Sequence, residues 1–333
     1  MKIFVSAPVG KTVRNTFFAP EACAHLERSF DVSYSPLDRQ LLPEELKQYA
    51  ADADVLMTGW GHCVLTAEAL EGTSIKLIAH TGGSVADYAD PGVYDAGIRV
   101  ISGNALYAES VAEGTLAYML LALRRMPDYV EEVRSGGWRL VSETEGLFDQ
   151  MVGIIGFGTI SRDLIRMLKP FRVKLKIYSG HTIDPSYLAE NDAVQVSLEE
   201  IFSTCKIVSL HSALTDKTRG MIGKEHFDLL QDGAIFINTA RGAIVRETEL
   251  IGALRENRLR AVLDVYEKEP LDAHSPLRSL SNVYCIPHRA GPTLDRRPMV
   301  TMALADDILR FSRGEALQYE ITSAQANRMT KER

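Results

Sequence analysis

A short glycine-containing segment between an apolar run and an amphipathic run is the first feature of the sequence that could hold a reactive cofactor. Gly156 and Gly158 form a Gly-x-Gly directly after the apolar residues 151–155. The first glycine permits a tight turn, and the second lets the backbone approach a pyrophosphate. The amphipathic run RDLIRMLKPF at 162–171 predicts a helix after this turn, which would offer unpaired N–H groups to the phosphates. The segment therefore predicts a dinucleotide-binding turn.

Two positions near this turn differ from the usual fingerprint. Ser161 stands where a third glycine would allow close helix packing, and serine is small enough to keep the fold. After the next predicted strand, where an acidic residue usually accepts the ribose hydroxyls, the chain reads YSGH at 178–181. Ser179 and His181 could donate hydrogen bonds to a ribose 2′-phosphate, although no arginine follows them. The sequence therefore leaves the choice between NAD and NADP open. Our hypothesis is that the protein accepts both cofactors or prefers NADP. The alternative is that these residues form a surface turn that does not contact the ribose.

Four further motifs follow in a fixed order, each at or just after a predicted strand. They read SLHSALT at 209–215, NTARG at 238–242, LDVYEKEP at 263–270 and PHRAG at 287–291. With these motifs the chain resembles the D-isomer-specific 2-hydroxyacid dehydrogenase family. The resemblance covers nearly the whole sequence and is strongest from about 150 to 292.

The resemblance implies an enzyme that moves a hydride between NAD(P)H and a small 2-oxo or 2-hydroxy acid, D-isomer specific, either similar to glyoxylate and hydroxypyruvate or bulkier. The family's catalytic Arg, Glu and His correspond to Arg241, Glu269 and His288. An arginine can bind a carboxylate or polarise a ketone with two donors. Histidine suits the proton transfer that ketone reduction needs, and Glu269 would fix its tautomer and favour the imidazolium.

The resemblance also implies which residues contact the cofactor. Asp264 is expected to accept a hydrogen bond from the nicotinamide carboxamide, while His211 and Ala240 supply mainly main-chain surface. The predicted cofactor contacts are Gly156, Gly158, Thr159, Ile160, Ser179, His211, Ala240, Asp264 and Gly291.

A second glycine-containing loop, AHTGGSV at 79–85, resembles the family loop whose amides receive the substrate carboxylate. The chain continues with Ala86-Asp87-Tyr88 where the family commonly has an aspartate and an asparagine, so we expect a different substrate pocket. His80 and Tyr88 either line that pocket or, as the alternative that we favour, pack in the core or at the surface. The predicted substrate contacts are Gly83, Ser84, Arg241 and His288.

The elements that must position these residues follow an alternating pattern. Short β-branched runs alternate with helix-length segments, which is typical of parallel strands with crossover helices. We therefore predict an α/β fold of two doubly wound parallel-sheet, Rossmann-like domains with the active site in the cleft between them. The predicted strands lie in 2–7, 53–60, 75–80, 99–103, 151–156, 174–179, 206–211, 234–240, 261–266 and 283–288.

The domain boundaries come from the resemblance, because the family inserts its cofactor domain into its substrate domain. Residues 1–103 and 294–333 would form a discontinuous, flavodoxin-like substrate domain, and 104–293 the dinucleotide-binding domain. The helical run from Leu294 would return the chain to the first domain. The apolar run 107–125 predicts a helix in the core or at a subunit interface, and we expect a homodimer.

Composition narrows the functional class further. With 333 residues and 46% hydrophobic residues the chain can form two domains, and a net charge of −7 argues against nucleic acid as a partner. We also predict no signal peptide, no membrane span and a cytoplasmic location. The cysteines show no zinc spacing, so we expect free thiols and no metal; they are Cys23, Cys63, Cys205 and Cys285.

Two alternatives to this enzyme stay open. One is a regulatory protein of the same fold that binds NAD(H) without turnover, against which the intact triad argues. The other is an enzyme for formate or phosphite, although formate dehydrogenases of this fold place a glutamine before the histidine partner that is Glu269 here. The sequence leaves open which acid is the substrate and which reaction direction is physiological.

Overall fold

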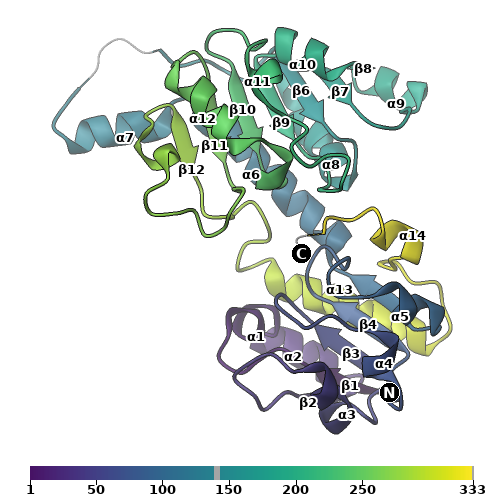
Figure 1. The fold of residues 1–333 in the computed structure, drawn as a ribbon. Helices are drawn as coiled ribbons and strands as arrows, with labels where there is room; N and C mark the ends of the chain where they lie inside the picture. Colours follow the sequence, from purple (N-terminus) through teal and green to yellow (C-terminus); the bar gives the residue numbers. More distant parts are fainter. Residues whose placement is uncertain (139–142, 332–333) are drawn as a thin grey trace. The chain divides into compact units, whose positions relative to one another are not determined.

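The chain passes twice between two structural units, each built around one parallel β-sheet (Figure 1). The computed structural model describes residues 1–138 and 143–331. Unit 1 comprises Met1–Tyr107 and Pro292–Arg333, and unit 2 comprises Ala108–Gly291. The crossing segments are the long helix α6 (Asn104–Leu123) and the stretch after Gly291.

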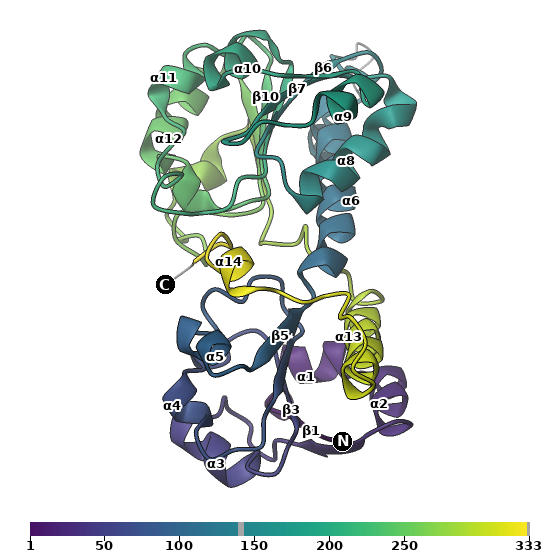
Figure 2. The ribbon, with the colours of Figure 1, turned by 90° about the vertical axis from the view of Figure 1, so that its right-hand side faces the viewer.

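The sheet of unit 1 has the strand order β2-β1-β3-β4-β5, with all neighbours parallel. Side chains alternate between its faces, so Ile3 and Val5 join one apolar cluster and Phe4 joins the other. Helices α1, α2 and α13 cover one face, and α3, α4 and α5 cover the other (Figure 2). The elements of unit 1 are β1 (Lys2–Val5), α1 (Thr12–Phe17), α2 (Pro20–Glu27), β2 (Asp31–Tyr34), η1 (Pro43–Glu45), α3 (Leu46–Tyr49), β3 (Val55–Thr58), α4 (Ala67–Leu70), β4 (Leu77–His80), α5 (Pro91–Asp95), β5 (Arg99–Ser102), α13 (Arg297–Ser312) and α14 (Ser323–Ala326).

The sheet of unit 2 has the strand order β12-β11-β10-β9-β6-β7-β8, again with all neighbours parallel. The order reverses between β6 and β9, which makes their carboxyl ends the switch point where ligands bind in doubly wound sheets. The elements of unit 2 are α7 (Met126–Arg134), β6 (Met151–Ile155), α8 (Thr159–Leu168), η2 (Lys169–Phe171), β7 (Lys174–Tyr178), α9 (Pro185–Glu190), β8 (Ala193–Gln195), α10 (Leu198–Thr204), β9 (Ile207–Leu210), α11 (Lys224–Phe227), β10 (Ile235–Asn238), η3 (Gly242–Ile244), α12 (Glu247–Arg255), β11 (Arg260–Leu263), η4 (Pro276–Ser279) and β12 (Val283–Cys285).

The predicted fold class of two doubly wound parallel sheets is confirmed, but the structure adds two strands that the sequence pattern did not reveal. They are β2 and β8, which lie at the edge of their sheets and have only half-buried or alternating side chains. The predicted C-terminal helix is α13, and it belongs to unit 1. Within residues 1–138 and 143–331, no helix is both long and apolar enough to cross a membrane.

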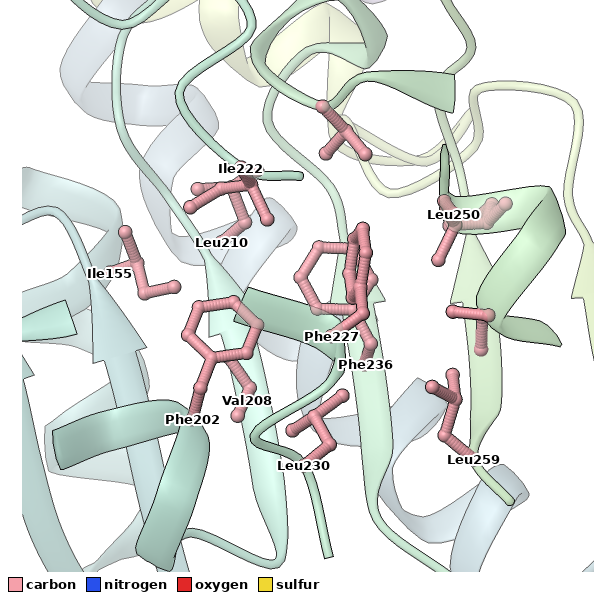
Figure 3. Packing of buried hydrophobic residues seen from close by; sticks show 14 of the residues in the cluster. Ile155, Phe202, Val208, Leu210, Ile222, Phe227, Leu230, Phe236, Leu250 and Leu259 are labelled. Carbon is pink, nitrogen blue, oxygen red and sulfur yellow. The ribbon is translucent and has the colours of Figure 1, made fainter. Parts of the chain in front are cut away.

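An aromatic cluster fills the space between one face of the unit 2 sheet and its helices (Figure 3). Phe236 of β10 packs edge-to-face on Phe227 with ring centroids 5.4 Å apart, and it stacks on Phe202 at 6.3 Å. All three rings are fully buried. β10 ends at Asn238, shortly before Arg241, so this packing also fixes the strand end from which the Arg241 loop begins.

Removing the central ring tests how much this cluster contributes to stability. We expect Phe236→Ala to lower the free energy of unfolding by about 3–5 kcal/mol, since a buried ring is replaced by a cavity. Chemical denaturation of the variant and of an exposed-site control, Leu229→Ala, measures the difference. A loss in Phe236→Ala no larger than in the control would contradict the central role of this ring.

Candidate active site

The glycine turn lies at the switch point of the unit 2 sheet. Gly156 follows β6 with φ +100°, in the region that favours glycine, and its N–H donates to the Tyr178 carbonyl at 2.8 Å. A Cβ at this position would lie only 2.6 Å from the Ser212 nitrogen of the segment after β9. The predicted tight turn is therefore required by the close approach of the β6 and β9 ends.

The next residues form the N-terminus of α8 and fit the predicted phosphate contact. Gly158 is the N-cap, and a Cβ there would meet nothing within 4 Å, so the backbone is open to an approaching group. Thr159 and Ile160 begin the helix, whose first N–H groups attract anions. Ser161 is buried and its hydroxyl donates to the Gly156 carbonyl at 2.8 Å, so it ties the helix to the turn in place of the third glycine.

The loop after β7 is predicted to face the adenosine ribose. Hydrogen bonds from the side chain of Gln195 of β8 hold its backbone. This side-chain amide donates to the His181 carbonyl at 2.8 Å and accepts from the Ile183 N–H at 2.9 Å. The Ser179 hydroxyl accepts from the His181 N–H at 3.1 Å. Ser179 is half-buried and His181 is exposed, so both can reach a ligand above the loop.

His211 follows β9, and its backbone N–H donates to the Ile155 carbonyl at 2.7 Å. Its Nε2 pairs with the Ser209 hydroxyl at 2.8 Å, and burial lowers the pKa of the imidazole to about 4. His211 is half-buried and its ring is neutral, and its main-chain contact with the cofactor stays a prediction.

Arg241 follows β10 on a loop whose backbone is fixed by Asn238. The Asn238 side chain accepts from the Ala240 N–H at 3.0 Å and donates to the Arg241 carbonyl at 3.1 Å. The guanidinium itself donates to the Ala240 carbonyl at 2.7 Å. At Gly242 any Cβ would overlap the carbonyl group of Tyr266, so only glycine lets this loop lie against the segment that carries Glu269.

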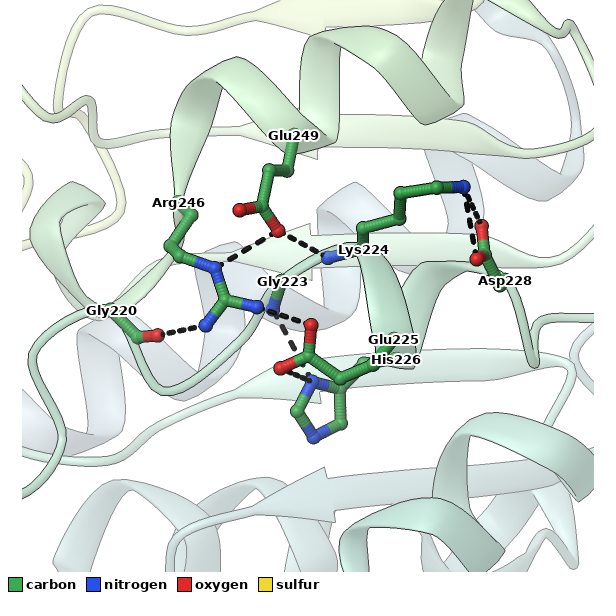
Figure 4. Close-up of polar contacts among 8 residues, drawn as sticks. All are labelled: Gly220, Gly223, Lys224, Glu225, His226, Asp228, Arg246 and Glu249. Carbon is green, nitrogen blue, oxygen red and sulfur yellow. Dashed lines mark hydrogen bonds and ion pairs between the residues drawn. The ribbon is translucent and has the colours of Figure 1, made fainter.

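A polar network supports the chain just after Arg241 (Figure 4). Residues 220–222 run beside 243–245, with the Gly220 N–H donating to the Ala243 carbonyl at 2.9 Å. Arg246 then joins the two segments, because its guanidinium donates to the Gly220 carbonyl at 2.7 Å and pairs with Glu225 and, at 2.9 Å, with Glu249. This network holds the segment that directly follows the Arg241 loop.

Glu269 and His288 form a hydrogen-bonded pair. The His288 Nδ1–H donates to Glu269 Oε2 at 2.8 Å, and the other carboxylate oxygen accepts from the Tyr266 N–H at 3.1 Å. The hydrogen bond from Glu269 raises the pKa of His288 despite partial burial. Burial is the largest single influence on Glu269 and opposes its ionisation, but the hydrogen bond and charge of His288, the Tyr266 N–H and the charge of Arg241 together outweigh it, so the pKa of Glu269 is lowered. The side chain of His288 is 47% exposed, so its Nε2 edge can reach a ligand.

The backbone of His288 is unusual, because its φ of +54° lies in the left-handed region that a non-glycine residue rarely adopts. Asp264 fixes this turn. Its carbonyl accepts from the His288 N–H at 2.9 Å, and its buried carboxylate accepts from the Arg289 and Ala290 N–H groups at 2.7 and 2.9 Å. The Tyr118 hydroxyl of α6 donates to the same carboxylate at 2.9 Å.

Asp264 therefore has a structural role that the sequence did not reveal, and its contact with a nicotinamide carboxamide stays a prediction. The structural roles of Tyr118, Asn238 and Gly242 were also not predicted from the sequence. Of these three residues only Asn238 and Gly242 could have been identified from it, since both lie inside the NTARG motif.

In unit 1, the predicted substrate loop follows β4. Within the described part of the chain, no group accepts a hydrogen bond from the Gly83 or Ser84 N–H, as a carboxylate-binding loop requires. The Ser84 hydroxyl donates to the Thr330 carbonyl at 2.7 Å. His80 is buried and stacks on Tyr88 at 4.4 Å, which confirms that His80 packs in the core. A residue that the sequence did not point to, Tyr107, lies 3.8 Å from where a Gly83 Cβ would be.

Unit 2 thus collects most of the predicted residues at the carboxyl ends of its strands, whereas Gly83 and Ser84 belong to unit 1. Gly291 is the last residue of unit 2. Among the residues for which the structure gives a position, no group of three or more His, Cys, Asp or Glu side chains could hold a metal ion.

Comparisons with known proteins agree with this geometry. The family model described as D-isomer specific 2-hydroxyacid dehydrogenase, NAD binding domain, matches residues 116–290. The glyoxylate reductase/hydroxypyruvate reductase of Mus musculus is 32% identical over 255 residues, which cover 75% of this chain and 78% of the relative. The glyoxylate reductase of Aeropyrum pernix is 31% identical over 311 residues, 89% of this chain and 91% of the relative. The TT0316 protein of Thermus thermophilus has a similar structure with a TM-score of 0.76 and 26% identity, covering 97% of this chain and 100% of that one.

The Glu269–His288 pair predicts a measurable titration. In Glu269→Gln the charged acceptor is lost, so the pKa of His288 falls. Less imidazolium is then present at any pH near neutrality. NMR titration of the His288 ring, assigned by comparison with His288→Gln, measures the midpoint. The matched control Glu267→Gln removes an exposed carboxylate nearby and leaves the midpoint unchanged; equal midpoints in all three proteins would refute the coupling.

Proposed function

Because the chain belongs to the D-isomer specific 2-hydroxyacid dehydrogenase family, we propose that His288, Glu269 and Arg241 are its catalytic residues. The protein is an oxidoreductase that moves a hydride between a nicotinamide cofactor and a small 2-oxo or 2-hydroxy acid. The observation that best supports the residue assignment is the 2.8 Å bond between His288 Nδ1 and Glu269 Oε2. Both relatives are named as reductases, which favours turnover over the regulatory alternative.

In this proposal the nicotinamide cofactor supplies or accepts the hydride when bound, and the residues 156–160 hold its pyrophosphate. His288 donates a proton from Nε2 to the oxygen of the 2-oxo group during reduction and recovers it in the reverse direction. Glu269 keeps Nδ1 protonated and the ring oriented, since it accepts from Nδ1. Arg241, on a loop fixed by Asn238, holds the carboxylate or the ketone oxygen.

For the substrate we propose a small 2-oxo acid of the glyoxylate and hydroxypyruvate type, as the names of the relatives suggest. Its carboxylate would be received by the N–H groups of Gly83 and Ser84, which no described residue uses. The predicted domain roles follow: 1–103 with 294–333 would bind substrate, and 104–293 would bind cofactor. Exclusion of water from the bound substrate would strengthen its electrostatic contacts.

A cytoplasmic location is part of the same proposal. The four cysteines all lie in the described part of the chain and form no disulfide, which is typical of a reducing compartment. The net charge of −7 also supports the absence of a nucleic-acid partner.

We also propose that the protein forms a homodimer through α7. None of the residues of this helix is buried, and Met126, Val130 and Val133 lie four and seven positions apart on one face with 46–57% exposure. Trp138, just beyond the helix, is 79% exposed. On the polar side, Asp128 of α7 accepts from the Tyr284 hydroxyl at 2.8 Å, so the helix is attached to unit 2 with its apolar face outward. An apolar patch of this kind is suited to pairing with the same patch of a second copy.

A charge on this face should separate the copies. We expect wild-type protein to elute as a dimer and Val130→Asp to elute as a monomer with unchanged far-UV circular dichroism, because a carboxylate would be buried unpaired. Size-exclusion chromatography with light scattering gives the mass. The matched control is Val194→Asp on β8, an exposed valine away from α7. A dimeric Val130→Asp protein would rule out this interface.

The catalytic assignment is tested on His288. We expect His288→Ala to lower kcat for glyoxylate or hydroxypyruvate reduction by about 10²-fold or more, the usual effect of losing an acid/base group. Cofactor affinity, measured separately by quenching of NAD(P)H fluorescence, should change little. His274→Ala, which removes an exposed histidine after β11, is the control. Near-normal turnover in His288→Ala would overturn the assignment.

A further inference from the structure

An arginine outside every predicted contact lies beside the cofactor turn. Arg162 belongs to the first turn of α8, and its guanidinium packs on the Phe157 ring at 4.2 Å and on the Tyr187 ring at 4.9 Å. The two rings lie 5.1 Å apart at an interplanar angle of 67°. Phe157 is the middle residue of the Gly-x-Gly turn, and Tyr187 belongs to α9.

These two aromatic residues come from the segments on either side of the position that the adenosine ribose takes. In a doubly wound sheet the ribose lies at the end of the second strand, beside the turn after the first. Here the second strand is β7, its loop is 179–184, and α9 begins directly after that loop. The Arg162 side chain therefore lies against one residue of the cofactor turn and one residue of the helix that follows the predicted ribose loop.

The way the guanidinium is held leaves it able to bind an anion. Aromatic rings contact the faces of the guanidinium, whereas its N–H donors point outward in its plane. Arg162 is exposed and forms no side-chain hydrogen bond or ion pair within the described ranges. Its neighbour Arg166, one turn further along α8, differs in this respect, because it pairs with Asp163 and Glu109, both at 3.2 Å.

The first residues of the loop on the other side carry no carboxylate. Residues 179–182 read SGHT, and the carboxylate of Asp184, at the end of the loop, accepts from the Ser186 N–H and hydroxyl. A carboxylate at the ribose position would repel a phosphate and accept the 2′-hydroxyl of NAD, and this chain has none there.

We propose that Arg162 is a specificity-determining residue that binds the 2′-phosphate of the adenosine half of NADP(H), with Phe157 and Tyr187 as positioning residues that hold its side chain. The inference rests on the proposed cofactor role of the turn at Gly156 and Gly158. From the residues after β7 alone, we expected no arginine to be available to a 2′-phosphate. The proposal revises this expectation, because the arginine comes from α8 instead.

A pair of ligands that differ only by the phosphate in question isolates this contact from catalysis. Isothermal titration calorimetry with adenosine 2′,5′-bisphosphate and with 5′-AMP, on the full chain without substrate, gives the two affinities. We expect the wild-type protein to bind the bisphosphate about 10-fold more tightly than 5′-AMP, as a charge-assisted contact would give. We expect Arg162→Gln to lose this preference with unchanged 5′-AMP affinity, and Arg162→Lys to keep part of it.

Arg166→Gln is the matched control, since it removes a paired arginine from the same helix and should keep the full preference. In turnover, Arg162→Gln should lower kcat/KM for NADPH by about the same 10-fold while that for NADH stays unchanged. The positioning role is tested with Tyr187→Leu, which should weaken binding of the bisphosphate selectively and to a smaller extent.

Three outcomes would overturn the assignment. A wild-type protein that binds both ligands equally, an Arg162→Gln variant that keeps the preference, or a variant that loses affinity for both ligands alike would each exclude a 2′-phosphate contact while leaving the cofactor turn in place. A wild-type protein that binds neither ligand would remove the proposed cofactor site together with the role of Arg162.

Discussion

The buried carboxylate of Asp264 determines where the imidazole of His288 can lie. A non-glycine residue in the left-handed region costs about 1–3 kcal/mol, and such a conformation persists only when its surroundings specify it from several sides. Here the specification comes from two peptide N–H groups, a tyrosine hydroxyl and the carbonyl of Asp264 itself. A carboxylate with no exposed surface needs such donors, so the turn satisfies the aspartate and the aspartate fixes the turn.

The other proposed catalytic residues are also positioned by contacts between the ends of adjacent strands. Asn238, at the end of β10, holds the loop of Arg241, and the Asp264 N–H donates to the Asn238 carbonyl at 3.0 Å. Gly242 then lets this loop lie against the Tyr266 peptide, whose N–H donates to Glu269. The loops that carry Arg241 and Glu269 are thus fixed largely through contacts of the main chain.

The sequence predicted the parts of this arrangement that repeat a local pattern. Strands buried on both faces, such as β6 and β9, appear as continuous apolar runs, and the glycine turn stands out between a strand and a helix. The edge strands β2 and β8 lack that signal because solvent covers one side of them, so their residues need not be apolar.

Contacts between residues far apart in the sequence could not be predicted from it for a different reason. The hydrogen bond between Tyr118 and Asp264 joins residues 146 positions apart. Arg162 and Tyr187 are separated in the sequence by the strand β7. Neither spacing has a periodicity that a linear reading can detect.

The division of unit 1 into two stretches of chain has a consequence for synthesis on the ribosome. Its sheet is complete once residue 107 has been made, but one face of that sheet is covered by α13, whose Leu304 and Ile308 belong to the same apolar cluster as Ile3 and Val5. Unit 2 is continuous in sequence and can fold while that face is covered by α1 and α2 alone. The part of the apolar surface that α13 covers in the folded protein therefore stays exposed in the nascent chain until the whole inserted unit has been translated.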